Sequence, residues 1–247
     1  MSTWSAQEIR NHRTAAARLI RIKDEVFSYL GAAKDATEYS THRFIMKKYE
    51  DNGLVSDYDL TIAAFGKNTA NVHHFPGKKT AKRLKPGDLV MIDIWARLAK
   101  PRSPFADITW MGYRGDRIPV SMQKIFDLVK KARERSLKYI ESELKQGRLP
   151  IGARVDAVAR GLIAREGFGK RFLHNTGHIL GFKSPHGDGG GFVRHNRHRI
   201  EKNIAYTIEP GIYLKDRFGV RSEIDFYVDD NMRLVVTTDI QDEIISI

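Results

Sequence analysis

The chain has 247 residues, no cysteine, and 42 Lys and Arg against 30 Asp and Glu, giving a formal net charge of +12. Its 41% hydrophobic and 10% aromatic content excludes a mainly disordered chain, and the lack of cysteine excludes disulfides, thiolate metal sites and a cysteine nucleophile. No apolar run reaches the ~18 residues of a membrane span, and residues 1–10 lack the apolar core of a signal peptide. We therefore expect a cytoplasmic protein without membrane association.

The first half of the chain predicts two helices followed by strands. Apolar residues recur at helical spacing over 5–30, and Ser5 and Glu8 have the spacing of a capping box. A second helix is expected over 37–52, because Gly53 follows as a stop signal. Strands are expected where apolar residues cluster, at 60–65, 89–95 and 105–113.

The second half predicts the same order of elements. Helices are expected over 119–144 and 155–166, followed by a stretch rich in Gly and His over 174–191. Further strands are expected at 204–209, 221–228, 234–238 and near the C-terminus. No linker separates the halves, so we expect one domain over residues 1–247, made of two similar halves at about 1–118 and 119–247.

Four acidic residues occupy matching positions in these halves. Asp93 and Asp107 lie 14 residues apart, and so do Glu209 and Glu223; each acid of the second pair follows its counterpart by 116 residues. All four follow or lie within apolar runs, where an unpaired carboxylate is costly. Each acid alone is equally explained by an ion pair, such as one with Arg97 or Arg221, but four matched acids favour divalent cations that relieve their repulsion.

A histidine in the Gly-rich stretch is the expected fifth ligand. His178 lies in the sequence Asn-Thr-Gly-His-Ile-Leu-Gly, where glycines let the backbone approach a site closely. Oxygen ligands with one imidazole suit Mn²⁺, Co²⁺, Fe²⁺ or Zn²⁺.

These residues resemble the pita-bread metallopeptidases, the family of methionine aminopeptidase, aminopeptidase P, prolidase and creatinase-type enzymes. The matching segments are Ile92-Asp93, Asp107-Ile-Thr109, Thr176-Gly-His178, Thr207-Ile-Glu209-Pro-Gly211 and Gly219-Val-Arg-Ser-Glu223. The resemblance implies an α+β fold with a curved, mainly antiparallel sheet covered by helices. Arg221 points to the aminopeptidase P/prolidase branch, since methionine aminopeptidases lack an arginine there. The resemblance covers only that branch's catalytic domain, so we expect a catalytic domain alone.

The resemblance also implies how two divalent ions would be held. Asp93 would bind one ion, Asp107 and Glu223 would bridge both, and His178 and Glu209 would complete the second. Mn²⁺ or Co²⁺ is the first expectation, with Zn²⁺ or Fe²⁺ as alternatives.

Other residues would act on the substrate. Glu209 would also handle the proton of the attacking water, His186 would steady the tetrahedral intermediate, and His73 and Arg221 would contact the peptide. Trp95 replaces a small residue that is usual in the family. Because side chains alternate along a strand, Trp95 shares a face with Asp93 and is expected to shape the pocket.

The activity implied is a two-metal exopeptidase that hydrolyses the N-terminal peptide bond, with preference for Xaa-Pro. A methionine aminopeptidase-like enzyme or another C–N hydrolase on the same fold stays open as an alternative. The expected partner is a peptide, and a homodimer is an open alternative. A non-catalytic binding module is less favoured, although basic loops offer a route to nucleic acid at Lys78, Lys79, Lys82, Arg83, Lys85 and 194–199.

Overall fold

The computed structural model describes residues 3–58 and 60–247 and has the helices that the sequence predicts. The α-helices are α1 (Ala6–Ala32), α2 (Glu38–Asp51), α3 (Val120–Lys145) and α4 (Gly152–Arg165). Two short 3₁₀ helices, η1 (Gly66–Ala70) and η2 (Gly169–Arg171), were not predicted. The capping box at the start of α1 is confirmed, because the Glu8 amide donates to Ser5 Oγ (3.3 Å) and the Ser5 amide donates to Glu8 Oε2 (2.7 Å).

The strands form three sheets. One contains β1 (Leu54–Val55), β2 (Ile62–Phe65), β3 (Leu89–Leu98), β4 (Ala106–Tyr113) and β10 (Ile245–Ser246). The second contains β5 (Ala205–Ile208), β8 (Ile224–Val228) and β9 (Leu234–Val236), and the third is the hairpin of β6 (Gly211–Leu214) and β7 (Phe218–Arg221). The pairing is antiparallel except for that of β10 with β4.

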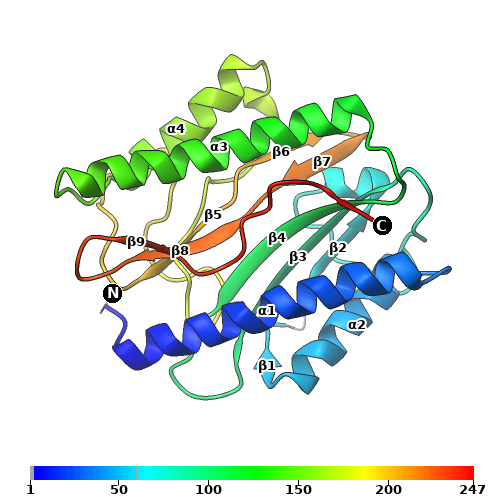
Figure 1. Cartoon of the computed structure of the whole chain (residues 1–247), viewed down its shortest axis with the longest axis horizontal. Helices are drawn as coiled ribbons and strands as arrows, with labels where there is room; N and C mark the ends of the chain where they lie inside the picture. The colour runs from blue at the N-terminus through cyan, green and yellow to red at the C-terminus, as the bar shows by residue number, and fades with distance from the viewer. Residues whose placement is uncertain (1–2, 59) are drawn as a thin grey trace.

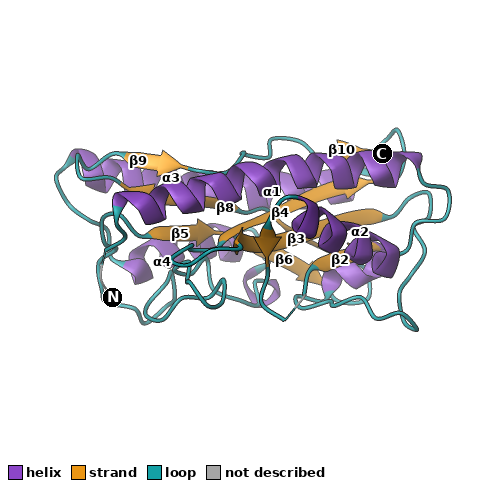
Figure 2. Ribbon diagram, turned by 90° about the horizontal axis from the view of Figure 1, so that it is seen from below, coloured by secondary structure: helices purple, strands orange, loops and turns teal. Residues whose placement is uncertain are grey.

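The long helices α1 and α3 run along the long axis of the molecule in front of the strands (Figure 1), and in the perpendicular view most strands lie below them (Figure 2). Strand β3 is buried on both faces, which explains its almost continuous apolar sequence. Val90, Ile92 and Ile94 belong to the apolar cluster that includes the buried face of α1. Asp93 and Trp95 alternate with them and therefore face the other side. None of the helices in the described ranges is long and apolar enough to cross a membrane.

The predicted strand over 221–228 is two strands in the structure. Strand β7 ends at Arg221, β8 begins at Ile224, and β7 turns back onto β6. Asp216 has a positive φ of 60° in the turn of this hairpin, a conformation that Asp tolerates better than most residues. As a result, the loop from β5 to β6 carries Glu209 and the break between β7 and β8 carries Glu223.

The two halves differ in strand register. Asp93 lies opposite Thr109 in the β3–β4 pair, whereas Asp225 lies opposite Thr207 in the β5–β8 pair. Under the offset of 116 residues, Asp225 corresponds to Thr109 but Thr207 precedes the counterpart of Asp93 by two residues. A shift of two residues leaves every side chain on its original face. We propose that residues 1–118 and 119–247 are nevertheless the two halves of one repeat.

Candidate metal centre

A cavity of about 240 Å³ brings all nine predicted site residues together. These come from separate elements: His73 from the loop after η1, Asp93 and Trp95 from β3, Asp107 from β4, and the rest from the second half of the chain. The other lining residues were not predicted: Asp57, Leu60, Ile62, Val72, Phe75, His174, Asn175 and Pro185.

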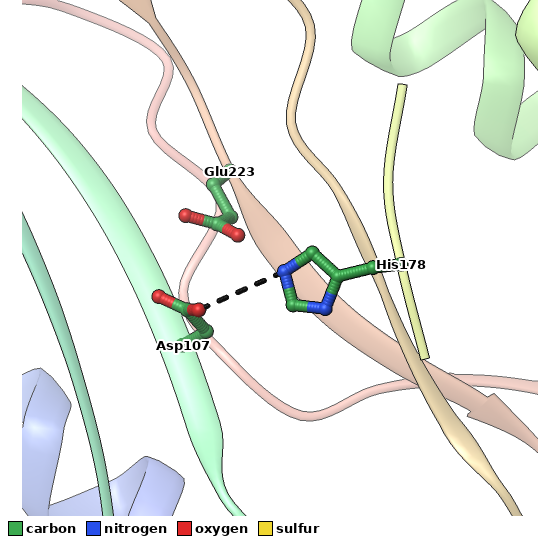
Figure 3. A group of neighbouring side chains, drawn as sticks. All are labelled: Asp107, His178 and Glu223. Carbon is green, nitrogen blue, oxygen red and sulfur yellow. Dashed lines mark ion pairs between the residues drawn. The ribbon is translucent and has the colours of Figure 1, made fainter. Parts of the chain in front are cut away.

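Three of the predicted ligands form a compact group. One ligand atom each from Asp107, His178 and Glu223 lies within 4.8 Å of the other two (Figure 3). Within this group, His178 Nε2 lies 3.8 Å from Asp107 Oδ2. A carboxylate from each half and one imidazole thus point at a common centre.

The imidazole of His178 is oriented by its backbone surroundings. Its Nδ1 lies 3.1 Å from the Ile179 carbonyl oxygen, to which it donates, so Nε2 carries the free lone pair. The His178 amide donates to Thr207 Oγ1 (3.0 Å). Burial lowers the pKa of His178 to about 4, which keeps the ring neutral and able to bind a cation.

The glycine before His178 is required by close packing. A Cβ on Gly177 would lie 2.1 Å from the Thr207 carbonyl oxygen, a distance that no side chain tolerates. The backbone around His178 therefore packs directly against β5, as the glycines in the sequence predict.

Glu209 also lies close to the imidazole of His178. Its Oε1 lies 3.3 Å from His178 Nε2 and accepts a hydrogen bond from Thr207 Oγ1 (3.2 Å). Burial, with a contribution from the carboxylate of Asp93, raises the pKa of Glu209 to about 7. A carboxyl with a pKa near neutrality can both accept and return a proton.

Asp93 is held by an ion pair. Its Oδ2 accepts a short hydrogen bond from Arg221 Nη2, and Arg221 Nη1 lies 4.0 Å from Glu209 Oε2. One of the ion pairs that the sequence leaves open is therefore present. Arg221 is 4% exposed, so it neutralises the Asp93 side of the site from within the protein.

Among residues 3–58 and 60–247, no Lys or Arg forms an ion pair with the other two carboxylates, Asp107 and Glu223. Within the same ranges, the buried Asp107 Oδ1 has no hydrogen-bond partner. Burial and the neighbouring carboxylates raise the pKa values of Asp107 and Glu223 well above their usual range. An orphaned oxygen and clustered acids whose charged forms are disfavoured both fit a bound divalent cation, and the oxygen and imidazole donors suit a hard or borderline metal.

Polar residues around the acids fix their positions, and sequence reasoning assigned them no role. Thr109 Oγ1 donates to Glu223 Oε2 (2.8 Å), and Asp225 Oδ2 accepts from the Asp107 amide (2.9 Å). Arg133, fully buried on α3, donates to Ser222 Oγ (2.6 Å). The sequence signal for Thr109 and Asp225 is their position two residues after an acid, which places them on the same face.

The predicted substrate-contacting histidines lie at the rim of the cavity. His186 and His73 are exposed, and the ring of His186 lies 4.2 Å from that of His178, centroid to centroid. His174, which was not predicted, binds the Tyr213 hydroxyl through Nε2 (2.7 Å). Burial, with Arg221 nearby, lowers the pKa of His174 to about 3, so this ring stays neutral.

Comparison with known families gives the same result as this geometry. The model of metallopeptidase family M24 matches residues 10–230. The chain belongs to this family. As a family M24 chain it carries, in the lining of its cavity, the oxygen and nitrogen donors of a candidate metal site.

Several family M24 relatives are similar over most of the chain. An uncharacterized peptidase of Bacillus subtilis, YqhT, is 27% identical over 94% of the chain and 61% of its own length. The Xaa-Pro dipeptidase of Pyrococcus furiosus is 25% identical over 87% of the chain and 62% of its own length. The chain thus spans about three fifths of the length of these relatives.

Solved structures show the same fold. A prolidase from Thermococcus sibiricus superposes with a TM-score of 0.86 at 27% identity, over 99% of this chain and 62% of its own. An X-Pro aminopeptidase from Thermotoga maritima gives 0.85 at 25% identity, over 99% and 64%. The pita-bread fold predicted from the sequence is confirmed.

Proposed function

We propose that this family M24 chain is a two-metal exopeptidase that hydrolyses the N-terminal peptide bond of peptides with proline in the second position. The observation that carries the proposal is the convergence of Asp107, His178 and Glu223 on one centre inside a cavity large enough for a short peptide end. The cavity also contains Glu209, whose raised pKa of about 7 suits its carboxyl to accept and return a proton.

The ligands divide as the resemblance implies. Asp93, Asp107, His178, Glu209 and Glu223 would hold the two ions. Mn²⁺ or Co²⁺ is proposed first, with Zn²⁺ or Fe²⁺ as alternatives. When bound, such ions supply a nucleophilic water at neutral pH and polarise the scissile carbonyl.

The chain's own residues perform the remaining steps. Glu209 takes the proton of the attacking water at its carboxylate and returns it to the leaving nitrogen, which for an Xaa-Pro bond departs as a secondary amine. His186, on the rim beside His178, donates a hydrogen bond to the oxygen that gains charge. His73, which also lines the cavity, contacts the substrate.

Arg221 has a role that differs from simple substrate contact. Its guanidinium is buried and bonded to Asp93. We propose that it limits the repulsion among the acids and fixes the orientation of the Asp93 carboxylate, while its side chain forms part of the cavity wall.

The preference for proline is supported by similar proteins that are Xaa-Pro dipeptidases, from Pyrococcus furiosus and Lactobacillus helveticus. The alternatives are a methionine aminopeptidase-like enzyme and another C–N hydrolase. A panel of Xaa-Pro dipeptides, Xaa-Pro-Yaa peptides and N-terminal Met peptides, assayed after loading with Mn²⁺ or Co²⁺, separates these activities. Faster cleavage of Met-Ala peptides than of Xaa-Pro peptides would contradict the proline preference.

The role of Glu209 is tested by replacement with Gln. Because the amide cannot exchange a proton, we expect Glu209→Gln to lower kcat by about a hundredfold to ten-thousandfold. Glu141→Gln, at an exposed position of α3, is the matched control and should keep full activity. Metal analysis of each protein checks that the change acts on catalysis, and turnover at the wild-type rate by the Glu209 variant would exclude the assigned role.

A further inference from the structure

Trp95 and Asp57 are bonded to each other in the wall of the cavity. Trp95 is 8% exposed, and its indole Nε1 donates to Asp57 Oδ1 at 2.5 Å. Leu60 also lines the cavity, and its amide donates to the Asp57 carbonyl oxygen (3.3 Å). Ile62, opposite Asp93 in the β2–β3 pair, is a further apolar residue of the lining.

Asp57 is an acid without a cation. Its side chain accepts a hydrogen bond from Trp95, and no Lys, Arg or His among residues 3–58 and 60–247 forms an ion pair with it. Asp57 is only half-buried, and it lines the cavity, so its second oxygen is available to a bound molecule.

The residues that line the cavity differ in exposure. His73, His186 and Phe75, which is 43% exposed, lie at its open rim. Trp95 and Ile62 are buried. The first residue of an exopeptidase substrate has no chain before it, so its side chain can contact this buried part of the lining, while the rest of the peptide leaves through the rim.

We propose that Asp57 and Trp95 select a peptide whose first residue is Lys or Arg. The aliphatic stem of that side chain packs on Leu60, Ile62 and the Trp95 ring, and its cationic end meets the Asp57 carboxylate. Long basic side chains bind in this way, with the stem on apolar surface and the charge at a polar site, and the indole face adds a cation–π attraction. The inference rests on the proposed aminopeptidase activity and names its substrate class.

The position of Asp57 favours the side chain over the α-amino group. The α-amino group of a substrate lies next to the scissile carbonyl, which must sit at Asp93 and Asp107 to be attacked. Trp95 lies opposite Asp107 in the β3–β4 pair, and Asp57 bonds the far tip of its indole, so the length of the indole separates Asp57 from Asp107. A Lys side chain with its four-carbon stem spans such a separation, and the α-amino group does not.

The test compares two substrates that differ only in charge. Lys-Pro-Ala and norleucyl-Pro-Ala present the same stem with and without an ammonium group. We expect the metal-loaded enzyme to favour the Lys peptide in kcat/KM, and Asp57→Asn to reduce that preference by about tenfold to a hundredfold through the Lys peptide alone. Asp57→Glu, which keeps the charge, should retain most of the preference. Asp116→Asn, at an exposed position, is the matched control and should leave both substrates unaffected.

A binding measurement separates this inference from the proposed activity. The indole N–H resonance of Trp95, identified by its loss in Trp95→Phe, should shift at lower concentrations of lysinamide than of norleucinamide. This difference should disappear in Asp57→Asn. This titration measures binding and needs no hydrolysis. It therefore gives a result even if the enzyme proves to cleave another bond.

The outcomes are decisive in each direction. Equal binding of the two amides by the wild-type protein, or an unchanged Lys preference in Asp57→Asn, would overturn the inference. An equal loss on both peptides would also overturn it and would assign Asp57 to the α-amino group. A selective loss with Lys, with the metal content and thermal unfolding unchanged, would support it.

Discussion

Thr109 offers the sharpest test of how the protein prepares its metal ligands. Its side chain is fully buried on β4, and its Oγ1 donates to Glu223 Oε2 at 2.8 Å. Its carbonyl oxygen also accepts from the Glu223 amide (3.4 Å). Thr109→Val replaces the hydroxyl with a methyl group and keeps a β-branched shape suited to a strand. The change therefore removes one hydrogen bond and leaves the backbone contact in place.

The size of the effect follows from the kind of bond. A hydrogen bond to a charged group contributes about 1.5–3 kcal/mol. Each 1.4 kcal/mol or so corresponds to tenfold in affinity, so Mn²⁺ binding should weaken by about tenfold to a hundredfold. The loss should appear in metal affinity more than in folding, because Glu223 has a raised pKa and gains most from its partners when it is ionised against a cation.

The assay is competition for Mn²⁺ between the protein and a fluorescent chelator at fixed pH. Thr14→Val, at an exposed site on α1 where the hydroxyl bonds only the Arg10 carbonyl, is the matched control. Thermal unfolding of the chelated proteins shows whether either change alters the fold itself. Wild-type affinity in a correctly folded Thr109→Val protein would refute the view that this hydroxyl prepares Glu223 for the metal.

Three further predictions concern stability. Removing metal with a chelator should lower the free energy of unfolding, by about 2.7 kcal/mol if the ion had been present at a hundred times its Kd, as thermal unfolding would show. Burial lowers the pKa of His12 to about 4, so stability present above about pH 6.5 should be lost as the pH falls toward 4, by about 2 kcal/mol at pH 5. His12→Gln should flatten this slope in denaturant titrations, and an unchanged slope would contradict the assignment. Gly177→Ala should cost about 1–3 kcal/mol or more, because its Cβ would meet the Thr207 carbonyl, whereas Gly161→Ala in α4 should not destabilise.

The helices were predictable because local signals agree with tertiary packing. Helix α1 combines a capping box with an apolar stripe, and the structure buries that stripe against β3 and β4. The β6–β7 hairpin was not predictable in this way. Residues 211–214 and 218–221 are short, and Arg221 and Glu223 lie two apart as in one continuous strand. Only packing against neighbouring elements separates β7 from β8.

The acids and the histidine that meet in the cavity were predictable, whereas most of their hydrogen-bond partners were not. Acids inside apolar runs are a strong signal, since burial without a partner is costly. The bond between Trp95 and Asp57 joins residues 38 positions apart, and nothing near Asp57 in the sequence indicates that its loop returns to β3. A substrate preference that depends on such a pair can be inferred only from the three-dimensional position of the loop.

The strand register explains why the repeat predicts the face of the sheet on which each acid lies, but not which acid joins the candidate metal site. Glu223 and Asp225 are both acids, two residues apart, and alternation alone places both on the face that receives Asp107. The two-residue difference in register between the β3–β4 and β5–β8 pairs decides between them. Glu223 falls at the strand break and joins His178 and Asp107, while Asp225 lies inside β8 and accepts the Asp107 amide. A shift of one residue would have turned both acids away from the cavity, so only an even shift is compatible with a four-acid site.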